Sequence, residues 1–309
     1  MADIVLEVDN LIKDYGSFRA VDGISFKVPR GKIVGFLGPN GAGKTTTIQM
    51  LLGITLLTSG SIKYFGQDFN KNKSKILSRI NSVSAFNTLL GRISAWENLV
   101  VFADLYEVKN VKEKINEFAR IFEVEDVIHQ RYWDLSSGQR TRINLIKALL
   151  NDPEIILMDE PTASLDPDIA DKTLTLIENL CHSKNLTILF TSHDMNEITR
   201  ICDEVIFLDK GKIVAQDTPL GLTKKIKESR LTIIFNGKQE MVEEALEEDA
   251  ISFKFTEKGR VEVIAEEKII PKLIIDIGKK GIEIVDLEVK KPSLEDVFLN
   301  FARGGQVES

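Results

Sequence analysis

The stretch GPNGAGKT at residues 38–45 constrains this chain most, because it fits the phosphate-binding pattern G-x-x-x-x-G-K-[ST]. The apolar run KIVGFL precedes it and is typical of a buried strand, while apolar residues follow at helical spacing from Ile48 to Leu52. A glycine-rich turn between a strand and a helix lets backbone N–H groups converge on phosphate oxygens. The stretch therefore predicts an α/β fold with a phosphate site.

Two side chains of this loop have separate expected tasks. Lys44 is expected to reach the terminal phosphates, and the hydroxyl of Thr45 is expected to bind Mg²⁺. The residues expected to surround the bound phosphates are Gly38, Pro39, Asn40, Gly41, Ala42, Gly43, Lys44, Thr45 and Thr46.

A pair of acids ends the apolar run IILMDE, residues 155–160. Asp159 is expected at the carboxyl end of a buried strand, where ligands of α/β sheets bind, and can hold Mg²⁺. Glu160 is then placed to orient and deprotonate a water molecule beside the phosphates. The alternative is an acid pair that only ends the strand and caps a helix.

Two further residues are candidates for the same site. His193 follows another apolar strand, in TSHDM, and its position favours a phosphate contact over a purely structural role. Tyr15, in KDYGSF, is an aromatic in a turn upstream of the loop. Stacking on a base and packing in the core are both open for Tyr15, and the residues alone do not decide between them.

Strand and helix patterns alternate along most of the chain, which predicts a mostly parallel sheet. The composition changes near residue 220, so we expect two domains, 1–222 and 223–309. The second has the order βαββαβ, a small α+β module of the ferredoxin-like kind, and a last helix is expected from the capping box at Ser293. The segments expected as strands in the first domain are 4–37 in part, 154–160, 186–192 and 204–215, with helices within 95–130.

Composition limits the partners and the setting. A net charge of -7 argues against a dedicated nucleic-acid binder, and two cysteines, Cys181 and Cys202, suggest a reducing compartment. The N-terminus does not resemble a signal peptide, and no run of 18 apolar residues predicts a membrane-spanning helix. Work at a membrane would therefore need a separate membrane chain.

The motifs GPNGAGKTT, LSSGQ, ILMDEP, SLD and TSHD stand in an order that resembles the ATP-binding subunits of ABC transporters. The resemblance covers roughly residues 4–215. It implies a P-loop fold of the ABC type, with a mixed sheet core, an antiparallel β subdomain and a helical subdomain at about 86–150. The C-terminal module and PSLEDVF, residues 292–298, look like the extension of ATPases that serve ABC-2-type exporters.

The resemblance also assigns roles. Two such ATPases face head to tail, and each ATP lies between the phosphate loop of one and the LSSGQ signature of the other. It implies that His193 is the switch histidine, that Tyr15 stacks on adenine, and that a set of residues acts on the partner's nucleotide: Ser136, Ser137, Gly138, Gln139 and Asp166. The simpler interpretation of LSSGQ is a helix N-cap by one of its serines.

Two departures from the family pattern matter. Ser137 stands where the signature usually has glycine. The family usually carries a glutamine at the position that Ala85 or Phe86 occupies here, and the segment 80–99 contains none. We therefore expect water or Asn87 to take the place of that glutamine, and we expect hydrolysis to be slow without the partner. Phe86 and Trp96 either pack in the core or line a groove for a membrane subunit.

The resemblance implies a Mg²⁺-dependent ATPase that energises export through a separate membrane-spanning permease. It implies a dimer on the cytoplasmic face of the membrane; a homodimer is expected, because Glu160 and the signature are intact, and a heterodimer stays open. No nucleic acid is expected as a partner, because the chain lacks basic tracts. Two alternatives are a soluble ATPase of this type that is not coupled to transport, and a nucleotide-gated binding module that hydrolyses ATP slowly or not at all. The transported substrate cannot be predicted, because the permease selects it.

Overall fold

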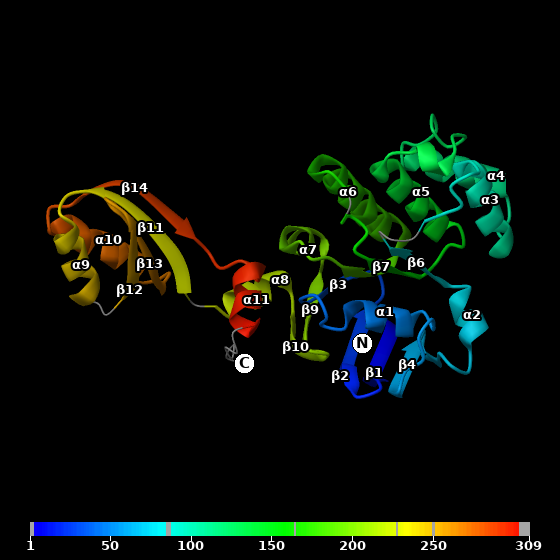
Figure 1. Cartoon of the computed structure of the whole chain (residues 1–309), viewed down its shortest axis with the longest axis horizontal. Helices are drawn as coiled ribbons and strands as arrows, with labels where there is room; N and C mark the ends of the chain where they lie inside the picture. The colour runs from blue at the N-terminus through cyan, green and yellow to red at the C-terminus, as the bar shows by residue number, and fades with distance from the viewer. Residues whose placement is uncertain (1–2, 85–87, 164, 227, 249–250, 303–309) are drawn as a thin grey trace. The chain divides into compact units, whose positions relative to one another are not determined.

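The computed structural model describes residues 3–84, 88–163, 165–226, 228–248 and 251–302. The chain forms two compact units, Met1–Pro219 and Leu220–Ser309. Each unit has its own sheets (Figure 1). Each also has its own hydrophobic core.

The central sheet of the N-terminal unit has the strand order β10-β9-β3-β8-β7-β6. Its strands are parallel except for β10, which pairs antiparallel with β9. β3, β7 and β8 are almost wholly buried, as their continuous apolar runs predict, and this confirms the mostly parallel sheet. The strands are β3 (Ile33–Leu37), β6 (Ile80–Ser84), β7 (Ile155–Asp159), β8 (Thr187–Thr191), β9 (Glu204–Asp209) and β10 (Lys212–Asp217).

A second, antiparallel sheet has the order β2-β1-β4-β5. Its strands are β1 (Ile4–Tyr15), β2 (Phe18–Pro29), β4 (Ser59–Tyr64) and β5 (Gln67–Asp68). Buried residues of this sheet, such as Phe26, share one core with Phe36 of β3 and with Ile48 of helix α1 (Lys44–Leu51). Helix α1, which follows the phosphate loop, is therefore held between the two sheets.

Helices α3 (Ala95–Leu105), α4 (Val111–Ile121) and α5 (Ser137–Leu149) gather into the helical subdomain that the family pattern predicts (Figure 1). Ser94 and Glu97 form a full capping box at the start of α3. The remaining helical segments of the unit are α2 (Lys73–Leu77), the 3₁₀ turn η1 (Tyr132–Asp134), α6 (Pro167–Lys184) and α7 (Met195–Ile201).

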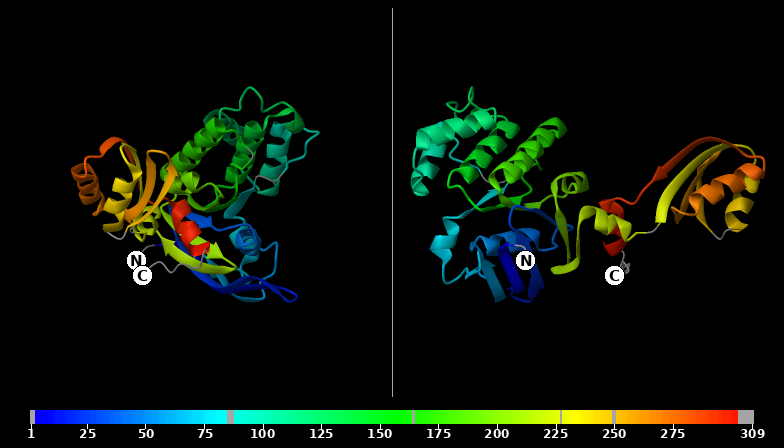
Figure 2. Two further views of the ribbon diagram at one scale, coloured as in Figure 1. Left: turned by 60° about the vertical axis from the view of Figure 1, so that its left-hand side comes forward. Right: turned by 180° about the vertical axis from the view of Figure 1, so that it is seen from behind.

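The C-terminal unit has the predicted order βαββαβ and the sheet order β12-β13-β11-β14, with all pairs antiparallel. Helices α9 and α10 cover one face of this sheet (Figure 2), and Val242 and Leu273 pack into its core. Ser293 and Asp296 exchange the predicted capping bonds before α11. The elements are α8 (Pro219–Lys224), β11 (Glu228–Asn236), α9 (Gln239–Glu248), β12 (Ser252–Glu257), β13 (Arg260–Glu266), α10 (Ile270–Lys279), β14 (Glu283–Lys290) and α11 (Leu294–Ala302).

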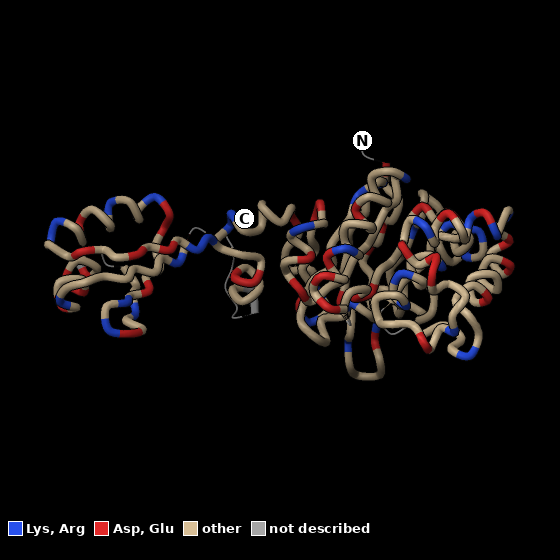
Figure 3. Tube along the Cα trace, turned by 90° about the horizontal axis from the view of Figure 1, so that it is seen from above, with Lys and Arg blue, Asp and Glu red and all other residues tan. Residues whose placement is uncertain are grey.

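Acidic and basic residues are interspersed along both units (Figure 3). Neighbouring side chains of opposite sign therefore meet at the surface, as Lys27 does with Glu7 at 2.8 Å. Exposed pairs of this kind contribute little to stability, so the cores hold each unit together.

Candidate functional site

The phosphate loop turns sharply between β3 and α1, and glycine is required at two of its positions. Gly38 has φ +155° and Gly43 has φ +102°. A Cβ atom on Gly38 would lie 2.3 Å from the carbonyl oxygen of Leu208, and one on Gly43 would lie 2.6 Å from that of Ala20. The neighbouring backbone thus leaves no room for a side chain at either position.

Lys44 begins α1 and is only 7% exposed. Its Nζ donates to the carbonyl oxygens of Gly38 at 2.6 Å and Pro39 at 3.3 Å. Burial lowers the pKa of Lys44, while Glu160 and Asp159 act in the opposite sense. The ammonium group is therefore held inside the loop, where the predicted phosphates would lie.

A pocket of about 210 Å³ opens at this loop. Phe18 lines it, although the sequence analysis chose Tyr15 as the aromatic of this turn. Phe18 is 63% exposed and Tyr15 is 48% exposed, with Nζ of Lys13 4.7 Å from the Tyr15 ring. The two aromatics lie three residues apart at the same turn, so the sequence offers both as candidates for stacking. The lining residues are Phe18, Ala20, Pro39, Asn40, Gly41, Ala42, Gly43, Lys44, Thr45, Thr46 and Glu160.

Thr191, which the sequence analysis missed, links the two acids. Asp159 ends β7 directly opposite Thr191 at the end of β8. The Thr191 hydroxyl donates to Oδ1 of Asp159 at 2.8 Å, and Glu160 N–H donates to the same hydroxyl oxygen at 3.0 Å. Glu160 itself has φ +50°, a rare conformation for a residue with a side chain. The turn after β7 is thus fixed from β8.

His193 and Glu160 meet beside the phosphate loop. Nδ1 of His193 lies 3.3 Å from Oε2 of Glu160, and His193 is the more exposed of the two. The adjacency of β7 and β8 produces this contact, because both residues follow the carboxyl ends of these strands. The site therefore brings together Lys44, Glu160 and His193 as a cation, a candidate base and a candidate phosphate contact.

The donor set fits Mg²⁺. Thr45 offers a hydroxyl oxygen at an exposed position of the pocket, and Asp159 offers a carboxylate. Mg²⁺ prefers hard oxygen ligands and binds through one or two carboxylates together with substrate phosphates and water. Within the described residues no three acidic, histidine or cysteine side chains form a metal cluster, and a metal bound with phosphates needs none.

The LSSGQ turn forms the start of α5 in the helical subdomain. Ser136 caps the helix: its Oγ accepts from Gln139 N–H at 3.3 Å, and Gln139 Oε1 accepts from Ser136 N–H at 2.8 Å. The simpler interpretation as an N-cap therefore holds for Ser136. Across the described ranges no acceptor meets the N–H groups of Ser137 or Gly138, the first two of the helix.

Gly138 is buried against α6 of the same chain. A Cβ atom there would lie 2.6 Å from Cγ2 of Ile169. Asp166 lies just before α6 as its N-cap residue, and its backbone oxygen accepts from Ile169 N–H at 3.0 Å. Gly138 thus has a packing role that the sequence did not show, and its contact with a partner's nucleotide stays a prediction.

The predicted glutamine substitution, at Ala85, Phe86 and Asn87, lies outside the described residues. Trp96 is described: it is partly buried in α3, and its ring centroid is 5.4 Å from that of His129. Its place in a groove for a membrane subunit stays a prediction.

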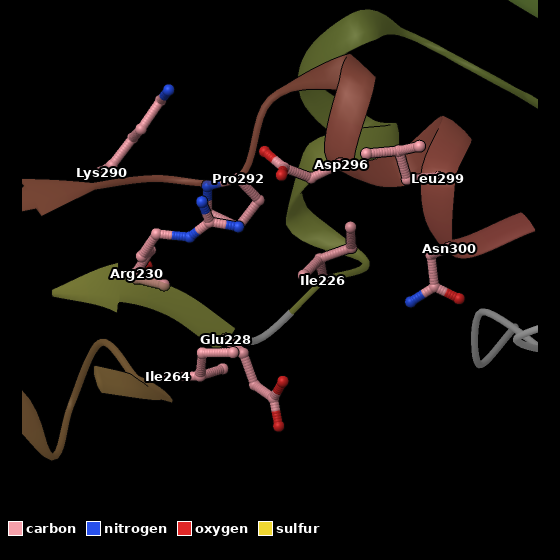
Figure 4. Close-up of a pocket in the computed structure, with 10 residues that line it drawn as sticks. Ile226, Glu228, Arg230, Ile264, Lys290, Pro292, Asp296, Leu299 and Asn300 are labelled. Carbon is pink, nitrogen blue, oxygen red and sulfur yellow. The ribbon is translucent and has the colours of Figure 1, made fainter. Parts of the chain in front are cut away.

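A cavity of about 400 Å³ lies within the C-terminal unit, where β11 begins and β14 ends (Figure 4). Arg230 and Lys290 are opposite each other in the sheet, and the Asp296 carboxylate points toward Arg230. Burial alone would raise the pKa of Asp296, but hydrogen bonds from Ser293 and the nearby cations lower it. The lining brings together two acidic side chains, Glu228 and Asp296, and two basic ones, Arg230 and Lys290.

Across the described parts of the chain, the helices are all too short or too polar to cross a lipid bilayer. Comparison with known proteins shows the family of the chain. The ABC transporter family model matches residues 21–163. The bacitracin transport ATP-binding protein BcrA of Bacillus licheniformis is 32% identical over 308 residues, covering 98% of this chain and 99% of that protein.

Other relatives agree. The Nod factor export ATP-binding protein I of Ralstonia nicotianae is 37% identical over 220 residues, covering 70% of this chain and 67% of that protein. A solved structure of an ATP-binding subunit of an ABC transporter superposes with a TM-score of 0.66 at 25% identity, covering 72% of this chain and 92% of that one. The chain therefore belongs to the ATP-binding subunits of ABC transporters, and it is an ATPase.

Proposed function

We propose that two copies of this chain associate head to tail around two ATP molecules, and that Mg²⁺-dependent hydrolysis in this homodimer powers export through a separate permease. Residues 1–222 supply the ATPase and residues 223–309 an accessory domain. The observation that carries the proposal is the contact between Glu160 and His193 beside the phosphate loop, at 3.3 Å. It would place a candidate base, Glu160, which lines the pocket, next to a candidate phosphate contact, His193.

The chemistry follows from these residues. When bound, Mg²⁺ would neutralise phosphate charge, held by Thr45 and Asp159. Glu160 orients and deprotonates the attacking water, Lys44 holds the terminal phosphates, and His193 contacts the γ-phosphate and orients Glu160.

The start of α5 supports the dimer. The N–H groups of Ser137 and Gly138 and the dipole of a 13-residue helix make a site for an anion. This start belongs to the helical subdomain, whereas the pocket lining comes from residues 18–46 and Glu160. A second copy, turned head to tail, would bring its α5 to the phosphates together with its Asp166.

The substitution Glu160→Gln tests the proposal. It keeps the side chain's size and removes the base, so turnover should fall about a hundredfold or more while ATP still binds. The ATP-bound dimer should accumulate and be visible by light scattering. Glu125→Gln, at an exposed position remote in sequence from the motifs, serves as the control. Turnover that is negligible in the wild type and unchanged in Glu160→Gln would favour the binding-module alternative, whereas substantial turnover that is unchanged would show that Glu160 is not the base.

Export and a permease are proposed from the relatives. One relative is named for bacitracin transport and another for Nod factor export. The ATPase then lies at the cytoplasmic face of the membrane, attached through the permease. Purification from membranes with a bound spanning protein, whose presence raises ATP turnover, supports this coupling. Full ATPase activity with no membrane protein bound in cells would support the uncoupled soluble alternative.

A further inference from the structure

A single carboxylate oxygen joins the loop that leads to Asp166 and the loop that carries His193. Oε2 of Glu197, on α7, accepts from the hydroxyls of Thr162 at 2.8 Å and Ser192 at 2.6 Å. Thr162 is 5% exposed and Ser192 is 3% exposed, so both hydroxyls are shielded from water. Hydrogen bonds to an ionised acceptor are stronger than those between neutral groups. This junction therefore fixes both loops to α7.

Each hydroxyl belongs to a loop with a different task. Thr162 starts the turn that leads to Asp166, and its carbonyl oxygen accepts from Leu165 N–H at 3.0 Å. Ser192 precedes His193, and its Oγ also accepts from Asp194 N–H at 3.0 Å. The Glu197 carboxylate thus connects the approach to Asp166 with the backbone on both sides of His193.

Hydrogen bonds hold this junction, and packing is incomplete on one side of it. A cavity of about 330 Å³ lies beside it, lined in part by Thr162, Leu165, Ser192, His193 and Glu197. Loops next to open space lack the neighbouring atoms that would fix them sterically. Loss of the Glu197 bonds would therefore free the two loops from each other.

We propose that Glu197 is a positioning residue that couples the Asp166 loop to His193. The inference rests on the proposed function, because Asp166 faces the second subunit only in the head-to-tail dimer. When that subunit docks, a shift of the Asp166 loop reaches Ser192 through Glu197 and sets the distance between His193 and Glu160. Hydrolysis then depends on dimer closure. The structural alternative is an acid that stabilises only the first turn of α7.

The test uses side chains of similar size. Thr162→Val and Ser192→Ala each remove one hydroxyl, and Glu197→Gln keeps an acceptor oxygen without the charge. Asn196→Ala, on the same helix and exposed, is the matched control. We expect kcat to fall about tenfold in each hydroxyl variant with KM for ATP within about twofold, and Glu197→Gln to lie between wild type and Glu197→Ala.

The double variant decides between coupling and separate effects. If one path joins the loops, Thr162→Val with Ser192→Ala loses no more activity than either single variant; independent roles give multiplied losses. The inference would be overturned if kcat were the same in all variants as in the Asn196→Ala control. It would also be overturned if the losses of kcat followed the losses of melting temperature alone. Failure of this inference can be distinguished from failure of the proposed function. The proposed function stands after these outcomes if Glu160→Gln still abolishes turnover and traps the dimer.

Discussion

Lys147 gives a prediction whose size follows from its surroundings. It lies on α5, and its Nζ donates to the carbonyl oxygen of Ser82 at 3.2 Å and to Oδ1 of Asn81 at 3.3 Å, both on β6. The Phe102 ring centroid is 5.5 Å away. Burial lowers the pKa of Lys147 to about 8. The helix that starts with the signature thus reaches the central sheet through a partly buried cation.

The sign of the pH effect follows from this lowered pKa. Below about pH 8 the lysine is protonated in both states, and the full cost of burying its charge, about 3 kcal/mol, weakens the fold. Above pH 8 the folded protein releases the proton while the unfolded chain keeps it up to its ordinary pKa of 10.5. Stability therefore rises with pH, and we expect this group to contribute about 2 kcal/mol of increase from pH 7 to pH 9.5.

Lys147→Met isolates this contribution, because methionine has a similar shape and does not titrate. Urea unfolding followed by tryptophan fluorescence reports on the N-terminal unit, since Trp96 and Trp133 both lie there. The difference in unfolding free energy between wild type and variant should shift by about 2 kcal/mol between pH 7 and pH 9.5. Other groups, such as half-buried Tyr106, whose pKa is raised by burial, titrate in both proteins and cancel.

The exposed Lys172 of α6 provides the control. Lys172→Met should give an unfolding free energy that runs parallel to wild type over the same pH range. If the Lys147→Met difference stays constant to within about 0.5 kcal/mol, the lysine is well hydrated and the reasoning is wrong.

Three further predictions concern the site. Gly138→Ala should lower the free energy of unfolding by about 1–3 kcal/mol, because the added Cβ overlaps with Ile169, and adding Ile169→Ala should restore that stability. If ATP turnover also returns in the double variant, glycine is needed at position 138 for packing and not for the approach of a phosphate. Tyr15→Ala and Phe18→Ala should differ in their effect on the ATP dissociation constant. If the base stacks on one of the two rings, removal of that ring should weaken ATP binding by about 1–3 kcal/mol, and removal of the other should not. Equal small effects would exclude stacking on either ring. Thr191→Val should lower kcat about tenfold and raise the Mg²⁺ concentration for half-maximal turnover, because its hydroxyl joins the two acids; an unchanged Mg²⁺ dependence would contradict that link.

The sequence predicted the parts of the fold that local patterns determine. Buried apolar runs predicted β3, β7 and β8, and the loop that follows β3 was recognisable from its glycines and Lys44. The contact between Glu160 and His193 could be predicted from the sequence, because both residues follow strands that are expected to be neighbours. The segment from residue 54 to 79, with β4, β5 and α2, has short elements and weak periodicity, and it was not assigned.

Contacts between distant segments could not be predicted in this way. Thr191 looks like an ordinary strand residue, and Glu197 like an ordinary acid in a helix, until the strand order places them beside their partners. The approach of Ile169 to Gly138 depends on how α6 crosses the start of α5. Phe18 and Tyr15 are both aromatics of one turn, and the sequence alone does not show that Phe18 lines the pocket.

The two halves of the proposed site differ in how they are prepared. The half that holds the phosphates is built within one chain, since Thr191 fixes both acids and Lys44 is held by the carbonyls of its own loop. In the signature half, the Ser136 side chain is already engaged as a helix cap. A partner's nucleotide would therefore be met mainly by backbone N–H groups and the helix dipole. Backbone groups tolerate a change from glycine to serine at position 137 better than a side-chain contact would, provided that the added Cβ points outward, and Ser137 is indeed exposed.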